Sequence, residues 1–172
     1  MRVMLAIVFI GIVAISLYTV FYIRTVGHDP QVWHLDPRSA PQSESPNSFR
    51  LVQSSLTDLP VDLEAPTYAV NAATLSEAFD RYVMGQPRVE RVAGSTEEAF
   101  ITYVQRTEGL QFPDYISVQF YDFGDTGTST IAIYSRSRFG YADMGVNEAR
   151  VKAWLKSIAS FEQDPATIVS DE

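Results

Sequence analysis

The chain has 172 residues, of which 46% are hydrophobic, and its formal net charge is -8 at pH 7. A nucleic-acid binder needs a surplus of basic side chains to contact phosphates, so this charge argues against that class of protein. The chain contains no cysteine, which excludes disulfides, zinc-thiolate sites, iron-sulfur ligation and thiol nucleophiles.

The first segment predicts a transmembrane anchor. Residues 3–23 are apolar and uncharged, and about 20 such residues in a helix span the hydrocarbon core of a bilayer. A cleaved signal peptide has a shorter apolar stretch, about 7–15 residues, that ends at a small-x-small site, and neither feature is present. The aromatic residues Tyr18, Phe21 and Tyr22 suit the headgroup level, and Arg24 follows them. We expect residues 1–24 to form an uncleaved single-pass anchor.

The orientation of this anchor is only weakly specified. Arg2 and the α-amine on one side oppose Arg24 and Arg38 on the other, so the positive-inside rule is nearly balanced. A very short leader before an apolar run is common in signal anchors, which favours the amino terminus inside and the rest of the chain outside. Because the flanking segments are acidic, we expect a tethered domain rather than one held to anionic lipid by a basic patch.

Proline density predicts an extended Pro/Ser-rich linker over residues 25–66. Proline removes a backbone donor and interrupts helices and inner strands. His28 and His34 lie in this segment, share no helical face and have no carboxylate at metal-ligand spacing. We therefore expect them at the surface and not in a metal site. Six prolines are responsible for the pattern: Pro30, Pro37, Pro41, Pro46, Pro60 and Pro66.

Residues 67–161 predict a compact α+β domain. Thr74 is the expected cap of a first helix, which ends before Gly85. Four strand-like runs follow, and the third alternates between apolar and polar residues. The loop 124–127 predicts a hairpin between the third run and the fourth. The runs cover residues 88–93, 100–106, 115–123 and 129–138.

A last helix completes the predicted domain. Asn147 is its expected cap, and Val151, Trp154, Leu155 and Ile158 form an apolar stripe at helical spacing. Since no helix separates the strands, we expect an antiparallel sheet of about four strands with the helices packed on one face. Residues 162–172 form an acidic tail.

The densest polar cluster is the candidate binding site. Two arginines on one strand face, close to a helix amino terminus, could hold a carboxylate or phosphate. In the alternative interpretation, Asp143 pairs with Arg136 or Arg138 and Asn147 only caps the helix. The cluster consists of Arg136, Arg138, Asp143, Asn147 and Arg150.

No catalytic, metal or cofactor site is predicted. Residues 67–161 contain no histidine or cysteine, so they hold no nucleophile-base pair of the Ser-His or Cys-His kind. The chain has no P-loop, dinucleotide-binding fingerprint or HExxH motif. Asp114, Asp122 and Asp125 are assigned to turns and the surface rather than to a cation site. We expect no cofactor.

Residues 131–155, IAIYSRSRFGYADMGVNEARVKAWL, resemble the signature of the DUF1499 family. Its members share a pattern of alternating Arg and Ser, then Gly, Asp, GVN and RV. A second short motif, FPD at residues 112–114, also resembles the family, and the resemblance covers about residues 67–160. Pro46 and Asn47 match a PN near the family's start, but Ser48 stands where many members have Cys. The family implies no activity, and its bacterial members are often membrane-anchored or exported.

Together these features predict a single-pass protein of the bacterial inner membrane whose domain lies on the periplasmic side. The expected function is non-catalytic binding or scaffolding, including service as an accessory subunit of a membrane complex. The alternative is a small hydrolase or transferase acting on an anionic substrate held by Arg136, Arg138 and Arg150, with Asp143 as base. Expected partners are the membrane, a membrane protein or an anionic small molecule, and not nucleic acid.

Overall fold

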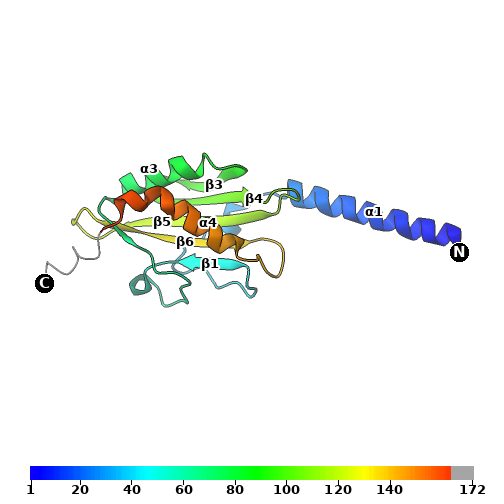
Figure 1. Cartoon of the computed structure of the whole chain (residues 1–172), viewed down its shortest axis with the longest axis horizontal. Helices are drawn as coiled ribbons and strands as arrows, with labels where there is room; N and C mark the ends of the chain where they lie inside the picture. Colours follow the sequence, from blue (N-terminus) through cyan, green and yellow to red (C-terminus); the bar gives the residue numbers. More distant parts are fainter. Residues whose placement is uncertain (164–172) are drawn as a thin grey trace.

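The amino-terminal helix stands apart from the rest of the chain. A computed structural model describes residues 1–163, and its first helix, α1 (Arg2–Thr25), projects from one end of the domain (Figure 1). The helix is long and apolar enough to cross a membrane, and no residue of its most apolar 18-residue window is buried. The predicted apolar helix is therefore confirmed.

A single antiparallel sheet forms the centre of the domain. Its strand order is β1-β6-β5-β4-β3, and β2 also pairs with β6. The α+β class is confirmed, and the sheet has six strands rather than about four because residues before and just after position 66 add β1 and β2. The strands are β1 (Ser48–Leu51), β2 (Thr67–Tyr68), β3 (Val89–Ser95), β4 (Phe100–Arg106), β5 (Pro113–Asp122) and β6 (Ser129–Ser137).

Helices cover one face of this sheet. Because side chains alternate along a strand, Ile116, Val118 and Phe120 of β5 all point to that face, where they are buried. Phe79 and Trp154 contact each other edge to face, with ring centroids 6.1 Å apart. The core therefore lies between the sheet and its helices, which are α3 (Ala72–Val83), α4 (Val146–Leu155) and the 3-10 helix η2 (Lys156–Phe161).

Both expected helix caps are displaced by a few residues. The cap of α3 is Asn71, whose Oδ1 accepts a hydrogen bond from the Thr74 amide at 2.8 Å. Asn outranks Thr as a helix cap, which explains the shift. The cap of α4 is Gly145, with φ 80°, so Asn147 lies inside the helix with a buried side chain.

The segment 25–66 is not the extended linker that its prolines predict. We call residues 27–47 the strap, because they lie across the second face of the sheet and include the short helix α2 (Pro30–Trp33). Trp33 stacks on Tyr115 of β5 with ring centroids 3.7 Å apart. Beyond the strap, residues 48–51 form β1, and η1 (Ser54–Leu56) follows. Proline prevents regular hydrogen bonding, but it does not prevent side chains from packing.

His34 illustrates how closely the strap packs. Its ring stacks on Phe100 with centroids 3.8 Å apart, and its Nδ1 lies 2.9 Å from the Thr102 hydroxyl. Gly94 adopts φ +76° beside this ring, and a Cβ there would lie only 1.9 Å from the Phe100 carbonyl oxygen. Glycine is therefore required at this position, which follows the bulge between Arg91 and Ala93 in β3. Of the predicted acidic tail, residues 164–172 lie outside the described residues.

Candidate functional site

The structure separates the five predicted site residues between the two faces of the sheet. Arg136 is opposite Tyr115 in the β5–β6 register, so it points to the strap, whereas Ser135 is opposite Ile116 and points to α4. Arg138 also reaches the strap. The other three residues, Asp143, Asn147 and Arg150, lie together at the amino-terminal end of α4.

Arg136 and Arg138 bind the protein's own backbone. Arg136 Nη2 donates to the Trp33 carbonyl at 3.0 Å, and its guanidinium lies 4.9 Å from the centre of the Trp33 ring. Arg138 Nη1 donates to the Gly27 carbonyl at 2.9 Å. Burial lowers the pKa of Arg136. The strap therefore occupies the positions where the sequence suggested an anion.

Two more arginines hold the strap and the end of α1 that precedes it. Arg50 is fully buried, and its Nη2 donates to the Ala40 carbonyl at 2.6 Å while its Nη1 donates to the Pro37 carbonyl. Burial lowers the pKa of Arg50 as well. Arg106 Nη1 donates to the Ile23 carbonyl, at the end of α1, at 3.0 Å. These four guanidinium groups thus donate to backbone carbonyl oxygens rather than to carboxylates. We call them the arginine clamp: Arg50, Arg106, Arg136 and Arg138.

His28 joins the clamp as a neutral ring. Its Nε2 lies 3.1 Å from Arg106 Nη2, and because a guanidinium can only donate, Nε2 is the acceptor. The proton then sits on Nδ1, which donates to the Tyr115 hydroxyl at 2.8 Å. Burial, followed by the positive charge of Arg106, lowers the pKa of His28. This histidine has a packing role that its sequence context did not indicate.

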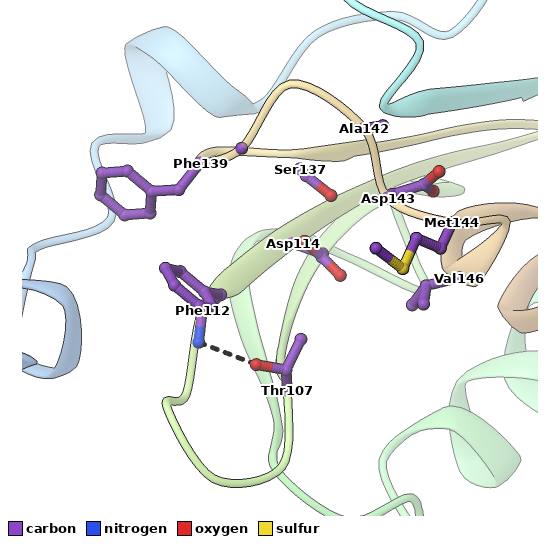
Figure 2. A pocket seen from close by; sticks show the side chains of 10 residues that line it. Thr107, Phe112, Asp114, Ser137, Phe139, Ala142, Asp143, Met144 and Val146 are labelled. Carbon is purple, nitrogen blue, oxygen red and sulfur yellow. Dashed lines mark hydrogen bonds between the residues drawn. The ribbon is translucent and has the colours of Figure 1, made fainter.

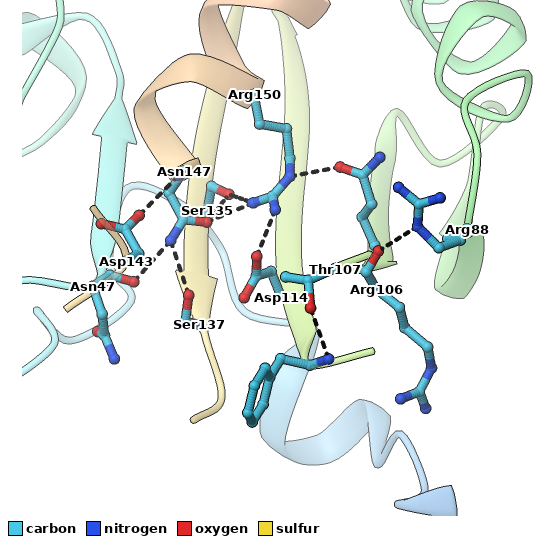
Figure 3. A network of polar contacts seen from close by, with 12 residues as sticks. Asn47, Arg88, Arg106, Thr107, Asp114, Ser135, Ser137, Asp143, Asn147 and Arg150 are labelled. Atoms are coloured by element: carbon cyan, nitrogen blue, oxygen red, sulfur yellow. Dashed lines mark hydrogen bonds and ion pairs between the residues drawn. The ribbon is translucent and has the colours of Figure 1, made fainter. Parts of the chain in front are cut away.

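On the opposite face, Arg150 is the centre of a buried polar network (Figure 3). Its Nη2 donates to Asp114 Oδ2 at 2.5 Å, and the two side chains are only 6% and 4% exposed. The remaining donors reach Gln105 Oε1 at 2.7 Å and Asn147 Oδ1 at 2.6 Å. A buried guanidinium with this many acceptors is fully engaged in fixing α4 to the strand ends.

Asn147 and Asp143 extend the network to the loop before α4. Asn147 Nδ2 donates to the Asn47 carbonyl at 2.9 Å, and Asn47 Nδ2 donates to the Gly140 carbonyl at 2.9 Å. Asp143 accepts hydrogen bonds from the amides of Gly145 at 3.1 Å and Asn147 at 2.8 Å. Its oxygens are thus occupied by the helix start, and among the described residues it forms no ion pair with Arg136 or Arg138.

A cavity of about 260 Å³ lies beside this network (Figure 2). The loops that carry much of its lining lie at the end of the domain from which α1 leaves (Figure 1). Asp114 is 3% exposed and lines the cavity. Within residues 1–163, its side chain accepts one hydrogen bond, from Arg150 to Oδ2, and Oδ1 faces no protein donor. The lining residues of this pocket are Thr107, Phe112, Asp114, Ser137, Phe139, Gly140, Ala142, Asp143, Met144 and Val146.

Aromatic contacts connect the pocket to α1. Phe112 and Phe139 lie along one side of the pocket with ring centroids 6.1 Å apart. Phe139 also contacts Tyr22 of α1 edge to face at 6.3 Å, and Arg24 Nη2 donates to the Gly109 carbonyl at 2.9 Å. The loops that surround the pocket are therefore docked against the last turns of α1.

Sequence reasoning missed Asp114 as a site residue. It was assigned to a turn or the surface, but it is the buried partner of Arg150. The available signal was its place at the start of a strand whose following residues are buried, where an acidic side chain needs a partner. In the part of the chain that the structure describes, no group of His, Asp and Glu side chains is arranged to hold a metal ion.

The fold and the site define an α+β domain that is held by its own strap and preceded by an apolar helix, with a pocket beside a buried polar network. Residues 38–158 match the model of the family described as "Protein of unknown function (DUF1499)". The chain belongs to the DUF1499 family, as the signature predicted. The match begins within the strap, well before residue 67, which agrees with the packing of the strap on the sheet. A comparison with curated proteins finds no match.

Proposed function

We propose that this protein is a non-catalytic binding domain, tethered to the inner membrane by α1 and exposed on the periplasmic side, whose ligand site is the pocket beside Asp114. One observation carries the proposal: Asp143 and Arg150, which the catalytic alternative requires as base and anion-binding group, are occupied by structural hydrogen bonds. Both oxygens of Asp143 accept from backbone amides, and the donors of Arg150 are engaged. Asp143 and Arg150 therefore shape the site, and neither is free to act as a base or to hold an anionic substrate.

The hydrolase or transferase alternative lacks its substrate cradle. It requires Arg136, Arg138 and Arg150 around one anion, but the sheet lies between the first two and the third. Arg136 and Arg138 are also bonded to strap carbonyls. A substrate would have to displace the strap to reach them, and the geometry therefore supports binding over catalysis.

The tether rests on α1 itself. Its apolar residues are exposed along almost the whole helix, up to Ile23, and this exposure is unfavourable in water and stable in a bilayer. If the ligand is an apolar segment of another membrane protein, the domain acts as an accessory subunit of that protein's complex.

The test is a capture experiment with a blocked pocket. Ala142 is an exposed residue of the pocket lining, so Ala142→Trp fills the pocket with little effect on the core. Ala149→Trp is the matched control, because Ala149 is exposed on α4 and does not line the pocket. Tagged full-length chains are purified from their native membranes in mild detergent, and bound lipids and proteins are identified by mass spectrometry.

We expect molecules that accompany the unchanged chain and Ala149→Trp but are lost from Ala142→Trp. Identical sets of bound molecules from all three chains would contradict a ligand site in this pocket. A catalytic activity that Asp143→Asn retains and Ala142→Trp loses would also contradict the proposal. It would show that the pocket catalyses a reaction without Asp143 as base.

A further inference from the structure

The position of α1 in the bilayer determines how far the pocket lies from the membrane surface. Tyr18, Phe21 and Tyr22 are exposed near the carboxyl end of this helix, and aromatic side chains of a spanning helix settle at the headgroup level. Tyr22 contacts Phe139 beside the pocket. The pocket therefore opens close to the layer of lipid headgroups.

The loops around the pocket present apolar side chains to solvent. We call Leu110, Tyr141 and Met144 the rim; they are 48%, 76% and 98% exposed. Met144 is held outward by a backbone with φ 54°, a left-handed conformation that a methionine rarely adopts. Exposed apolar groups beside a spanning helix indicate contact with the lipid surface.

The interior of the pocket favours a cation. Its charged lining residues are Asp114 and Asp143; Arg150 pairs with Asp114, and Asp143 forms no ion pair among residues 1–163. Asp114 is 3% exposed, and its Oδ1 faces no protein donor among residues 1–163. The face of the Phe112 ring also attracts cations, whereas the Phe139 ring already has the Arg138 guanidinium 5.6 Å from its centre.

The size of the pocket limits the ligand further. A cavity of about 260 Å³ is below the usual range of roughly 300–1,000 Å³ for a whole small-molecule ligand. It suits one polar headgroup, while the acyl chains of the same molecule stay in the bilayer below the rim. A phosphate cannot be the inner group, because Asp114 and Asp143 would repel it.

Building on the proposed function, we infer that the rim lies in the headgroup layer and that the pocket binds the primary ammonium headgroup of a membrane lipid, with N-H groups donating to Asp114 Oδ1. Phosphatidylethanolamine has this chemistry. Phosphatidylcholine has the same charge but no N-H donor, and phosphatidylglycerol has no cation. Comparing the three lipids therefore distinguishes binding through N-H hydrogen bonds from binding through positive charge, and both from nonspecific retention of bilayer lipid.

The first experiment measures lipid selectivity. The full chain is reconstituted in nanodiscs with equal amounts of phosphatidylethanolamine, phosphatidylcholine and phosphatidylglycerol, and retained lipids are counted by native mass spectrometry. We expect phosphatidylethanolamine to exceed phosphatidylcholine by about tenfold, the factor that one charge-assisted hydrogen bond supplies. Ala142→Trp should abolish this preference, and Ala149→Trp should keep it. Equal retention of the three lipids, or a preference that survives Ala142→Trp, would overturn the inference.

The second experiment measures depth. Because the chain has no cysteine, Tyr141→Cys and Met144→Cys each provide a single site for a fluorescent label in lipid vesicles. Asp125→Cys, in the exposed hairpin at the opposite end of β5 and β6, is the control. We expect spin-labelled headgroups to quench the two rim labels and not the control. Rim labels as accessible to water as the control, or covered by a co-purified protein instead of lipid, would overturn the inference.

The two proposals fail in distinguishable ways. If Ala142→Trp releases some other molecule in the capture experiment while no lipid preference is found, the binding function stands and the lipid assignment falls. If Ala142→Trp changes neither result, both proposals fall.

Discussion

Breaking the buried pair of Asp114 and Arg150 should be the most damaging single change near the pocket. In Asp114→Ala, a guanidinium that is 6% exposed loses its carboxylate at 2.5 Å. Removing one partner of a buried pair costs about 3–5 kcal/mol. Because Gln105, Ser135 and Asn147 still accept from Arg150, we expect the lower end, about 3 kcal/mol. At roughly 2–4 °C per kcal/mol, the melting temperature should fall by roughly 6–12 °C.

The assay is a double-mutant cycle on the full chain in detergent, with unfolding followed by circular dichroism. Arg150→Met leaves the buried Asp114 carboxylate without its ion-pair partner and should also destabilise the fold. The double variant should lose less stability than the two single variants together, by about 2 kcal/mol. Glu148→Ala is the control, because Glu148 pairs with Lys152 at 2.6 Å in solvent and such pairs contribute about 0.5 kcal/mol. Additive losses, or an Asp114→Ala effect as small as the control's, would refute the reasoning.

Three further changes test the loop, the histidines and the strap. Asp143→Ala should lower the free energy of unfolding by about 1 kcal/mol through the lost helix-start hydrogen bonds, and Asp143→Asn should recover most of it in denaturant titrations; equal losses would contradict the capping role. His28 and His34 both have a lowered pKa, chiefly through burial, so the unfolded chain takes up protons first. The free energy of unfolding should therefore fall as the pH drops through 6.5. Between pH 7.5 and 5.5, the melting temperature of the double variant with Asn at both positions should depend less on pH than that of the unchanged chain. An equal pH dependence of the two melting temperatures would contradict this expectation. Arg50→Met should speed protease cleavage within residues 27–47 by about tenfold, since two buried hydrogen bonds are lost; unchanged cleavage would mean that the clamp does not hold the strap.

The amino-acid sequence alone determined the features that depend on neighbouring residues. The uncharged run 3–23 predicts α1, because the length of an apolar helix follows from composition. Alternation within 115–123 predicts β5, and the turn residues 124–127 predict its hairpin with β6. The signature in residues 131–155 predicts the family. Each of these signals is contained within one stretch of chain.

Only the tertiary structure decided what the arginines do. Arg136 and Arg138 are two residues apart on one strand, which the sequence reveals, but the presence of strap carbonyls around them depends on contacts with residues about a hundred positions away. The same holds for Asp114, which meets Arg150 only because β5 and α4 pack on the same end of the sheet. A proline-rich composition predicts that a segment lacks regular hydrogen-bonded structure. It carries no information about whether the segment packs on a surface that is distant in the sequence. Local propensity therefore specified the elements, whereas long-range packing specified the site.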